Sequence, residues 1–240
     1  MGEPSLTDQV RFWDEWNKHK GTSGAPSRLT ARKCASVLGF LEGLRLSNPA
    51  ILEVGCGTGW MAERLSRHGT VTALDLAEEA VLDARSRYPG IEFMAGDILT
   101  LELSERRFEV IVTMETVSHV SDQPAFFAKL ASLLKPGGHL IVTCQNRFVF
   151  QRRNEVMAQG AGQIRHWLTM AELKRLMRPR FRIRKTATVG PAGERGILRW
   201  VNSTRLAGLL EWAITEAGAE RLKERLGFGQ TLVVLGRLRG

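Results

Sequence analysis

Glycines at positions 55, 57 and 59, with Glu53 just ahead of them, form the clearest chemical pattern in this chain. They follow the apolar run 51–54, which is typical of a strand buried in a parallel sheet, and apolar residues return at helical spacing from Trp60 onward. We therefore expect a strand, a glycine loop and a helix. Because glycine has no side chain, a ligand can lie against the backbone of such a loop. Dinucleotide sites use G-x-G-x-x-G, which would need a glycine in place of Trp60, so the spacing favours a different cofactor.

Carboxylates close the next two predicted strands. Residues 71–75 form an apolar run that ends in Asp75, about 20 residues after the loop, where an acid can accept hydrogen bonds from both hydroxyls of a ribose. Residues 91–98 predict a third strand, which ends in Gly96-Asp97. Parallel strands bring their carboxyl ends to one edge of a sheet, so we expect these acids to share a site with the glycine loop.

Two further predicted strands, at 108–114 and 139–144, complete a series of five motifs; the second of them follows Leu134-Lys-Pro-Gly-Gly138. The series resembles the class I S-adenosylmethionine (SAM) dependent methyltransferases. The resemblance implies that Glu53 supports the methionine end of SAM, that Asp75 holds the ribose, and that the product is S-adenosylhomocysteine (SAH). The residues that it assigns to the cofactor are Glu53, Gly55, Cys56, Gly57, Gly59, Trp60, Asp75, Leu76, Asp97, Ile98, Met114 and Glu115.

The order of the elements predicts the architecture. Strands alternate with helices between residues 47 and 146, which indicates a doubly wound α/β fold. The resemblance implies a Rossmann-like, seven-stranded, mostly parallel sheet with helices on both faces, a last strand that runs antiparallel, and helical lid insertions. We expect one globular domain overall, with an N-terminal helical cap at 1–46, the SAM-binding core at 47–146, and a substrate lid plus the last helices and two strands at 147–240.

His119 is the first candidate for a catalytic base. It lies just beyond the fourth predicted strand, where an acceptor hydroxyl would meet the methyl group, and an imidazole can take up its proton near neutral pH. The segment 114–120 resembles the MExxEHV motif of ubiquinone-biosynthesis O-methyltransferases, in which both Glu and the His are linked to a divalent metal and the substrate. Glu115 and His119 match, whereas Ser118 replaces the second Glu, so we expect no metal. In the alternative interpretation, His119 hydrogen-bonds the backbone and helps to start the next helix.

A second candidate base, His166, lies in a segment that loosely resembles the substrate-pocket segment of the same enzymes. Trp167 would provide an aromatic wall there, and Arg165 would bind a carboxylate or phosphate. In the alternative interpretation, Trp167 anchors the loop to the core and Arg165 is solvated. The candidate lid residues over the acceptor are Asn146, Arg147, Arg165, His166 and Trp167.

Residues 7–20 predict an amphipathic helix that carries Trp13 and Trp16. Aromatic residues at this spacing usually pack against other helices. A second possibility is that the helix covers the cofactor and sets an indole ring beside the sulfonium, where a cation–π contact contributes about 0.5–2 kcal/mol. Both interpretations stay open at this point.

The excess of basic over acidic residues lies in one segment of the chain. The net charge is +9, and residues 147–200 hold eleven Arg and two Lys against three Glu, so this segment accounts for the whole excess. Such a surface suits an anionic substrate group, an acidic carrier protein, an anionic membrane surface or nucleic acid. Nucleic acid is disfavoured, because no RNA-binding module is appended and aromatic residues are few. Mixed apolar and basic residues at 147–168 would suit a membrane surface.

We therefore predict an enzyme that transfers a methyl group from SAM to a small-molecule acceptor, most simply to a hydroxyl of an aromatic, lipophilic or anionic metabolite. The alternatives are an RNA methyltransferase that uses the basic segment and a quinone-type methyltransferase at a membrane surface. No apolar run approaches the roughly 18 residues that a membrane span needs, and the first residues lack the features of a signal peptide, so we expect a cytoplasmic protein.

Overall fold

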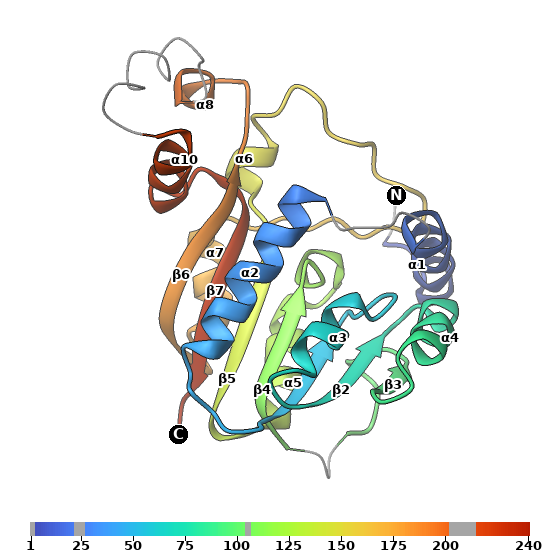
Figure 1. The fold of residues 1–240 in the computed structure, drawn as a ribbon. Helices are drawn as coiled ribbons and strands as arrows, with labels where there is room; N and C mark the ends of the chain where they lie inside the picture. The colour runs from blue at the N-terminus through green and yellow to red at the C-terminus, as the bar shows by residue number, and fades with distance from the viewer. Residues whose placement is uncertain (1–2, 22–26, 104–106, 202–214) are drawn as a thin grey trace.

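A seven-stranded sheet with the strand order β3-β2-β1-β4-β5-β7-β6 forms the centre of the molecule (Figure 1). The structure is a computed structural model, and it describes residues 3–21, 27–103, 107–201 and 215–240. The strands are β1 (Ala50–Val54), β2 (Thr70–Asp75), β3 (Glu92–Ala95), β4 (Phe108–Met114), β5 (Leu134–Gln145), β6 (Phe181–Pro191) and β7 (Gly229–Leu238).

The pairing of the strands confirms the predicted fold class. Strand β1 pairs in parallel with β2 and β4, so that Ile51 lies opposite both Val71 and Val110. Parallel pairing extends to β3 and β5 at the two sides. Strand β7 runs antiparallel to both β5 and β6. The carboxyl ends of β1, β2, β3 and β4 therefore meet at one edge of the sheet, where the predicted site residues lie.

Helices cover both faces of the sheet, and the alternation of side chains along each strand supplies a core to each layer. Leu52 and Val54 of β1 point into the core that contains α5 and α7, whereas Ile51 points into the core that contains α2, α3 and α4. The helical elements are α1 (Leu6–Gly21), α2 (Arg28–Glu42), α3 (Trp60–Leu65), α4 (Glu78–Arg87), the 3₁₀ turn η1 (Val117–His119), α5 (Gln123–Leu133), α6 (Arg147–Phe150), α7 (Met170–Met177), α8 (Ile197–Val201) and α10 (Glu216–Arg225).

Polar residues at the first turns explain where several helices begin. Asp122 caps α5, since its side chain accepts a hydrogen bond from the amide of Ala125 at 2.8 Å. Thr169 and Glu172 form a capping box at the start of α7, in which each side chain binds the backbone amide of the other residue. These capping contacts set the residues at which α5 and α7 begin.

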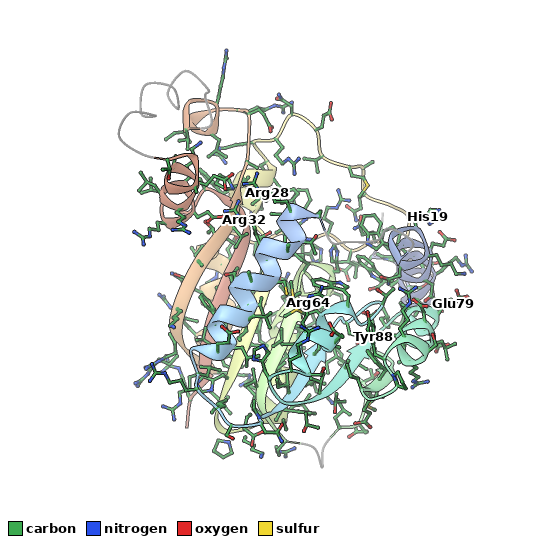
Figure 2. All side chains as sticks on the ribbon, in the orientation of Figure 1. His19, Arg28, Arg32, Arg64, Glu79 and Tyr88 are labelled. Carbon is green, nitrogen blue, oxygen red and sulfur yellow. The ribbon has the colours of Figure 1, made fainter. Side chains whose placement is uncertain are left out.

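Ion pairs join the N-terminal helices to the rest of the fold. Helix α1 lies against α4, where Lys18 pairs with Glu79 and Asp14 accepts the backbone N–H of Glu79 at 3.0 Å. Helix α2 is joined to α10 through Arg32, whose two terminal nitrogens lie 2.8 and 2.7 Å from carboxylates of that helix. Figure 2 shows Arg28 and Arg32 on the part of α2 nearest α10, and Glu79 beside α1. Helix α2 thereby lies on the sheet, against β5, β6 and β7, whereas α1 lies beside α4 at the side of the molecule (Figure 1).

Some predicted boundaries differ from the structure. Gly190-Pro-Ala-Gly193 has the composition of a loop, but strand β6 continues to Pro191, because the long strand β7 supplies pairing partners up to Gly229. The sequence of residues 203–226 predicts a mostly helical segment; part of it lies outside the described residues, and the described part contains α10. The sequence of residues 21–26, with two Gly and a Pro, predicts a joint, and most of it also lies outside the described residues. Within the described ranges, no helix combines the length and apolarity that crossing a membrane requires.

Candidate cofactor and acceptor site

The glycine loop after β1 adopts a backbone that other residues rarely reach. Gly55 and Gly59 have φ angles of 82° and 79°, in the left-handed region. A Cβ atom on Gly55 would lie 2.0 Å from the hydroxyl of Thr116, and one on Gly59 would lie 2.8 Å from the ring of Phe93. These two glycines are therefore required by close packing within the protein as well as by backbone conformation, and this packing sets the path of the loop.

Asp75 fixes the loop from the end of β2. Its carboxylate accepts the backbone N–H of Gly57 at 2.6 Å and that of Ala77 at 2.9 Å. Burial raises the pKa of Asp75, and the two amides act in the opposite direction. Each carboxylate oxygen has a second lone pair, so the residue can bind the loop and still accept a ligand hydroxyl. Asp75 thus both positions the loop and lines the cavity beside it.

Glu53 is the most perturbed acid of the site. Its side chain is buried, and Oε2 has no hydrogen-bond partner. Burial, with a further contribution from the charge of Asp75, raises the pKa of Glu53 to about 8. A buried acceptor without a partner is costly to the folded protein, which indicates that a ligand donor completes it. The methionine part of SAM carries such a donor, an ammonium group, so Glu53 fits the cofactor that the resemblance implies.

A large cavity of about 1270 Å³ lies over this edge of the sheet. Its floor holds the loop and the strand ends, and its walls come from α1, α2, the segment after β4 and the segment after β5. Gly59, at the end of the loop, packs against Phe93 and does not line the cavity. The predicted cofactor residues that do line it are Glu53, Gly55, Cys56, Gly57, Trp60, Asp75, Leu76, Asp97, Ile98, Met114 and Glu115.

His119 lines the same cavity at the end of η1. Its Nδ1 atom lies 2.6 Å from the carbonyl oxygen of Ile164, and a carbonyl only accepts, so the neutral ring must carry its proton on Nδ1. Nε2 is then the nitrogen with a free lone pair. Burial lowers the pKa of His119, which keeps the ring neutral at pH 7. The backbone hydrogen bond of the alternative interpretation is thus present, although Asp122 and not His119 caps the next helix, and Nε2 is left as the nitrogen that could accept a proton.

Helix α1 covers this part of the cavity with Trp13 and Trp16. The ring centroids of Trp13 and His119 are 4.7 Å apart, in an edge-to-face arrangement. Trp13 also packs against Phe12, at 4.8 Å between centroids. The aromatic residues of α1 therefore pack with one another and also cover the candidate base.

Glu115 occupies a strained position directly after β4. Its φ angle of 62° is unusual for a residue with a side chain. Its carboxylate accepts a hydrogen bond from Thr143 at 3.0 Å and pairs with Lys33, whose ammonium nitrogen lies 3.0 Å from Oε2. Lys33, on α2, lines the cavity and was not predicted from the sequence. In the sequence, Lys33 stands only as a basic residue next to Cys34 in the predicted helical cap, and that position does not predict its partner.

Three of the predicted lid residues do not line the cavity. Asn146 is buried, donates to the carbonyls of Gly227 and Gly229, and caps α6 through Phe148. Arg147 pairs with Glu172 at 2.5 Å. His166 is partly exposed, and its ring nitrogen lies 3.8 Å from Glu3. The structure gives these side chains contacts that join the lid to the strands, to α7 and to the N-terminal segment. Their assignment to substrate or catalysis gains no support from this placement.

Arg165 and Trp167 do line the cavity, although the guanidinium of Arg165 is engaged within the lid. It donates to the carbonyl oxygens of Met157 and Ala158 at 2.7 and 3.0 Å, and to the side chain of Gln163 at 2.7 Å. It also lies 5.2 Å from the ring of Trp167, which packs against Phe150. Arg165 therefore holds the lid together, and Trp167 provides the predicted aromatic wall.

No group of three or more His, Cys, Asp or Glu side chains in the described ranges is arranged to hold a metal ion. The carboxylate of Glu115, which the resemblance links to a metal in other enzymes, is paired with Lys33 instead.

The sheet order, the glycine loop and the acids at the strand ends resemble the arrangement that the sequence comparison with SAM-dependent methyltransferases implied. Residues 51–138 match the sequence family described as Methyltransferase domain. The fold also matches the N-methyltransferase NodS from Bradyrhizobium japonicum, whose crystal structure contains SAH, with a TM-score of 0.63. That match covers 95% of this chain and 99% of the other at 16% identity, so it shows a shared fold.

Two curated relatives agree with this class. A probable S-adenosylmethionine-dependent methyltransferase of Mycobacterium tuberculosis is 36% identical over 101 residues, which cover 42% of this chain and 37% of the relative. A ubiquinone biosynthesis O-methyltransferase of Coxiella burnetii is 34% identical over 109 residues, which cover 43% of this chain and 47% of the relative. The match spans less than half the length of either relative. The similarity to these relatives is therefore confined to the segment that contains the glycine loop and the parallel strands, and it does not identify the acceptor.

Proposed function

We propose that this protein transfers a methyl group from SAM to a hydroxyl oxygen of a small-molecule acceptor that binds beneath α1 and the lid segment 151–168. The observation that carries the proposal is the placement of His119. It lines the cavity that contains the glycine loop, and the carbonyl of Ile164 holds its ring in the tautomer that a base needs.

The chain offers matching groups for each part of the cofactor. The orphaned Oε2 of Glu53 would accept from the ammonium group, Asp75 from the ribose hydroxyls, and the Asp97 segment would contact the adenine. When bound, SAM supplies an electrophilic methyl group on a sulfonium that is its own leaving group. The protein has to align the reactants, and alignment of this kind can contribute about 7–11 kcal/mol.

His119 has a narrower role in this proposal. Its Nε2 accepts the proton of the acceptor hydroxyl as the oxygen attacks, and Nδ1 keeps its own proton on the carbonyl of Ile164. Trp13 shields the ring from one side, which excludes water from the base. A base of this type typically adds about 10²–10⁴-fold to the rate.

The contacts of the lid favour a small molecule over a membrane surface. Val149 is fully buried, Phe148 stacks on Phe228 with centroids 6.4 Å apart, and Phe150 packs against Trp167. These three side chains belong to the apolar set that suited a lipid interface in the sequence, and their packing leaves less apolar surface for a bilayer. Val156 of the same segment is exposed.

A turnover screen tests the proposal. Formation of SAH would be followed with purified protein, SAM and four groups of acceptor: hydroxylated aromatic compounds, amines, bulk RNA, and lipid quinols in anionic vesicles. We expect SAH to form with a hydroxylated aromatic compound and the rate to fall in His119→Gln. Turnover with RNA alone, or with amines alone, would contradict the proposal, and each outcome would name the acceptor class that replaces it.

A further inference from the structure

We infer that Arg153 binds a carboxylate group of the acceptor. Arg153 follows α6 and lines the cavity on the side of the lid. The inference depends on the proposed function, because it assigns a specificity residue to the same cavity. It also narrows the substrate class from an aromatic or anionic metabolite to a carboxylic acid.

The hydrogen bonds of Arg153 leave one edge of its guanidinium without an acceptor in the protein. Nη1 donates to the side-chain oxygen of Gln230 at 3.0 Å. Nε is shut off from solvent and has no hydrogen-bond partner. Nε and Nη2 share an edge of the planar guanidinium, and two N–H groups on one edge match the two oxygens of a carboxylate. A ligand carboxylate on this edge would satisfy a buried donor that the protein itself leaves unpaired.

The other permanent cations of the cavity are engaged by the protein. Four Lys and Arg side chains besides Arg153 line it in the described residues. Lys33 pairs with Glu115 at 3.0 Å, Arg64 lies 3.6 Å from Glu63, Arg87 pairs with Asp83, and Arg165 donates to three oxygens of the lid. No ion pair joins Arg153 to any carboxylate in the part of the chain that the structure describes. Glu155 also lines the cavity, but its side chain is exposed.

The surroundings of Arg153 suit an aromatic or similarly flat acid. The guanidinium carbon lies 5.5 Å from the centroid of the Phe150 ring, which lines the cavity together with Trp167. Gln145, at the end of β5, also lines it and has a buried side-chain oxygen without a partner. A hydroxyl of the ligand would satisfy that acceptor. This side of the cavity therefore offers an unpaired cationic edge, a hydrogen-bond acceptor and an aromatic wall, whereas the cofactor side holds the acids Glu53, Asp75 and Asp97.

Nearby Arg152 supplies a matched control. Its guanidinium lies 4.1 Å from the centroid of Phe148 and donates to the carbonyl of that residue, and it does not line the cavity. Arg152→Gln and Arg153→Gln remove the same charge from neighbouring positions. Arg153→Lys keeps the charge but loses the two-point edge.

The test compares two probes of similar shape, 4-hydroxybenzoate and 4-hydroxybenzamide, in which a charged carboxylate is replaced by a neutral amide. Their dissociation constants would be measured by NMR titration with each variant, in the presence and absence of SAH. We expect the wild-type protein to bind the carboxylate at least about tenfold more tightly than the amide. Arg153→Gln should abolish this preference, Arg153→Lys should retain part of it, and Arg152→Gln should retain all of it.

Two results would overturn the inference: a wild-type protein with no preference for the carboxylate, or a preference that survives in Arg153→Gln. Circular dichroism of each variant would confirm that it is folded. The affinity for SAH, measured on the same samples, tests the proposed function separately. A protein that prefers the carboxylate but fails to bind SAH would retain the role of Arg153 and reject the cofactor assignment.

Discussion

The ammonium nitrogen of Lys33 lies 3.0 Å from Oε2 of Glu115, and this ion pair joins α2 to the end of β4. Glu115 stands in a left-handed backbone conformation and also accepts a hydrogen bond from Thr143. The two side chains are only 15% and 22% exposed, so each charge depends on the other to offset its loss of hydration. A residue far away in the sequence thus holds the strained turn that precedes the candidate base.

Replacing Lys33 should destabilise the protein. Lys33→Met leaves the carboxylate of Glu115 without its counter-charge, and we expect the free energy of unfolding to fall by about 1–3 kcal/mol, measured by urea denaturation. The double variant Lys33→Met with Glu115→Gln should lose less than the two single variants combined, because neither charge is then left alone. Additive losses would show that the two residues act independently.

Glu53→Gln should weaken cofactor binding and stabilise the ligand-free protein. The pKa of Glu53 is raised to about 8 in the fold, so between about pH 4.5 and pH 8 the unfolded chain is ionised at this residue while the folded protein holds its proton. Unfolding releases that proton, and stability falls as the pH rises through this window. Glutamine removes the effect, and its advantage in unfolding free energy should grow from pH 5 to pH 8.

Glu53→Gln should weaken the binding of SAH, although it stabilises the ligand-free protein. An ammonium group pairs best with ionised Glu53, so wild-type affinity should rise between about pH 6 and pH 7.5. Glu53→Gln should bind SAH about tenfold or more weakly, with no such rise, as measured by calorimetry. If both proteins showed the same pH dependence, Glu53 would not contact the ammonium group.

His119→Gln should reduce turnover and leave SAM binding intact. We expect kcat to fall by about 10²–10⁴-fold, because the amide cannot take up a proton. The pKa of His119 is lowered by burial, so the base is neutral throughout the neutral range. In the wild type at saturating SAM, kcat should be level between pH 7 and pH 8 and should decline only on the acid side, at a lower pH than an ordinary imidazole would give. This acid limb should be absent from the variant, and a variant that keeps it would assign the limb to another group.

Trp13→Ala distinguishes a cation–π contact from packing alone. If the indole of Trp13 lies against the sulfonium, the variant should bind SAM about 2- to 30-fold more weakly, whereas its affinity for SAH, which has no sulfonium charge, should change less. Phe12→Ala serves as the control for loss of packing, because it removes a ring of the same helix that does not line the cavity. Equal losses for SAM and SAH would assign Trp13 to packing.

The fold could be predicted from the sequence because its signals are local. Each parallel strand is a short apolar run bounded by glycine or a carboxylate, and the alternation with helices indicates the sheet class. The loop glycines and the acids Glu53 and Asp75 belong to the same contiguous segments. Parallel pairing of the strands is enough to bring these residues to one edge of the sheet.

The acceptor side could not be predicted in the same way, because its contacts join distant segments. Lys33 reaches Glu115 from α2, and the Nδ1 atom of His119 binds a carbonyl 45 residues later in the chain. Among the basic residues at 147–200, the sequence favoured Arg165, which bonds within the lid, over Arg153, whose Nε has no partner in the protein. The roles of these arginines depend on which oxygens the tertiary fold places beside them.

A crystal structure of the protein with SAH would test the central claim most directly. The account predicts density for SAH over the glycine loop, with its ribose hydroxyls on Asp75, its ammonium group on Oε2 of Glu53, and its sulfur facing the part of the cavity lined by His119. If crystals soaked in saturating SAH showed this pocket empty, or showed the ligand bound elsewhere, the assignment of the cofactor site would be contradicted.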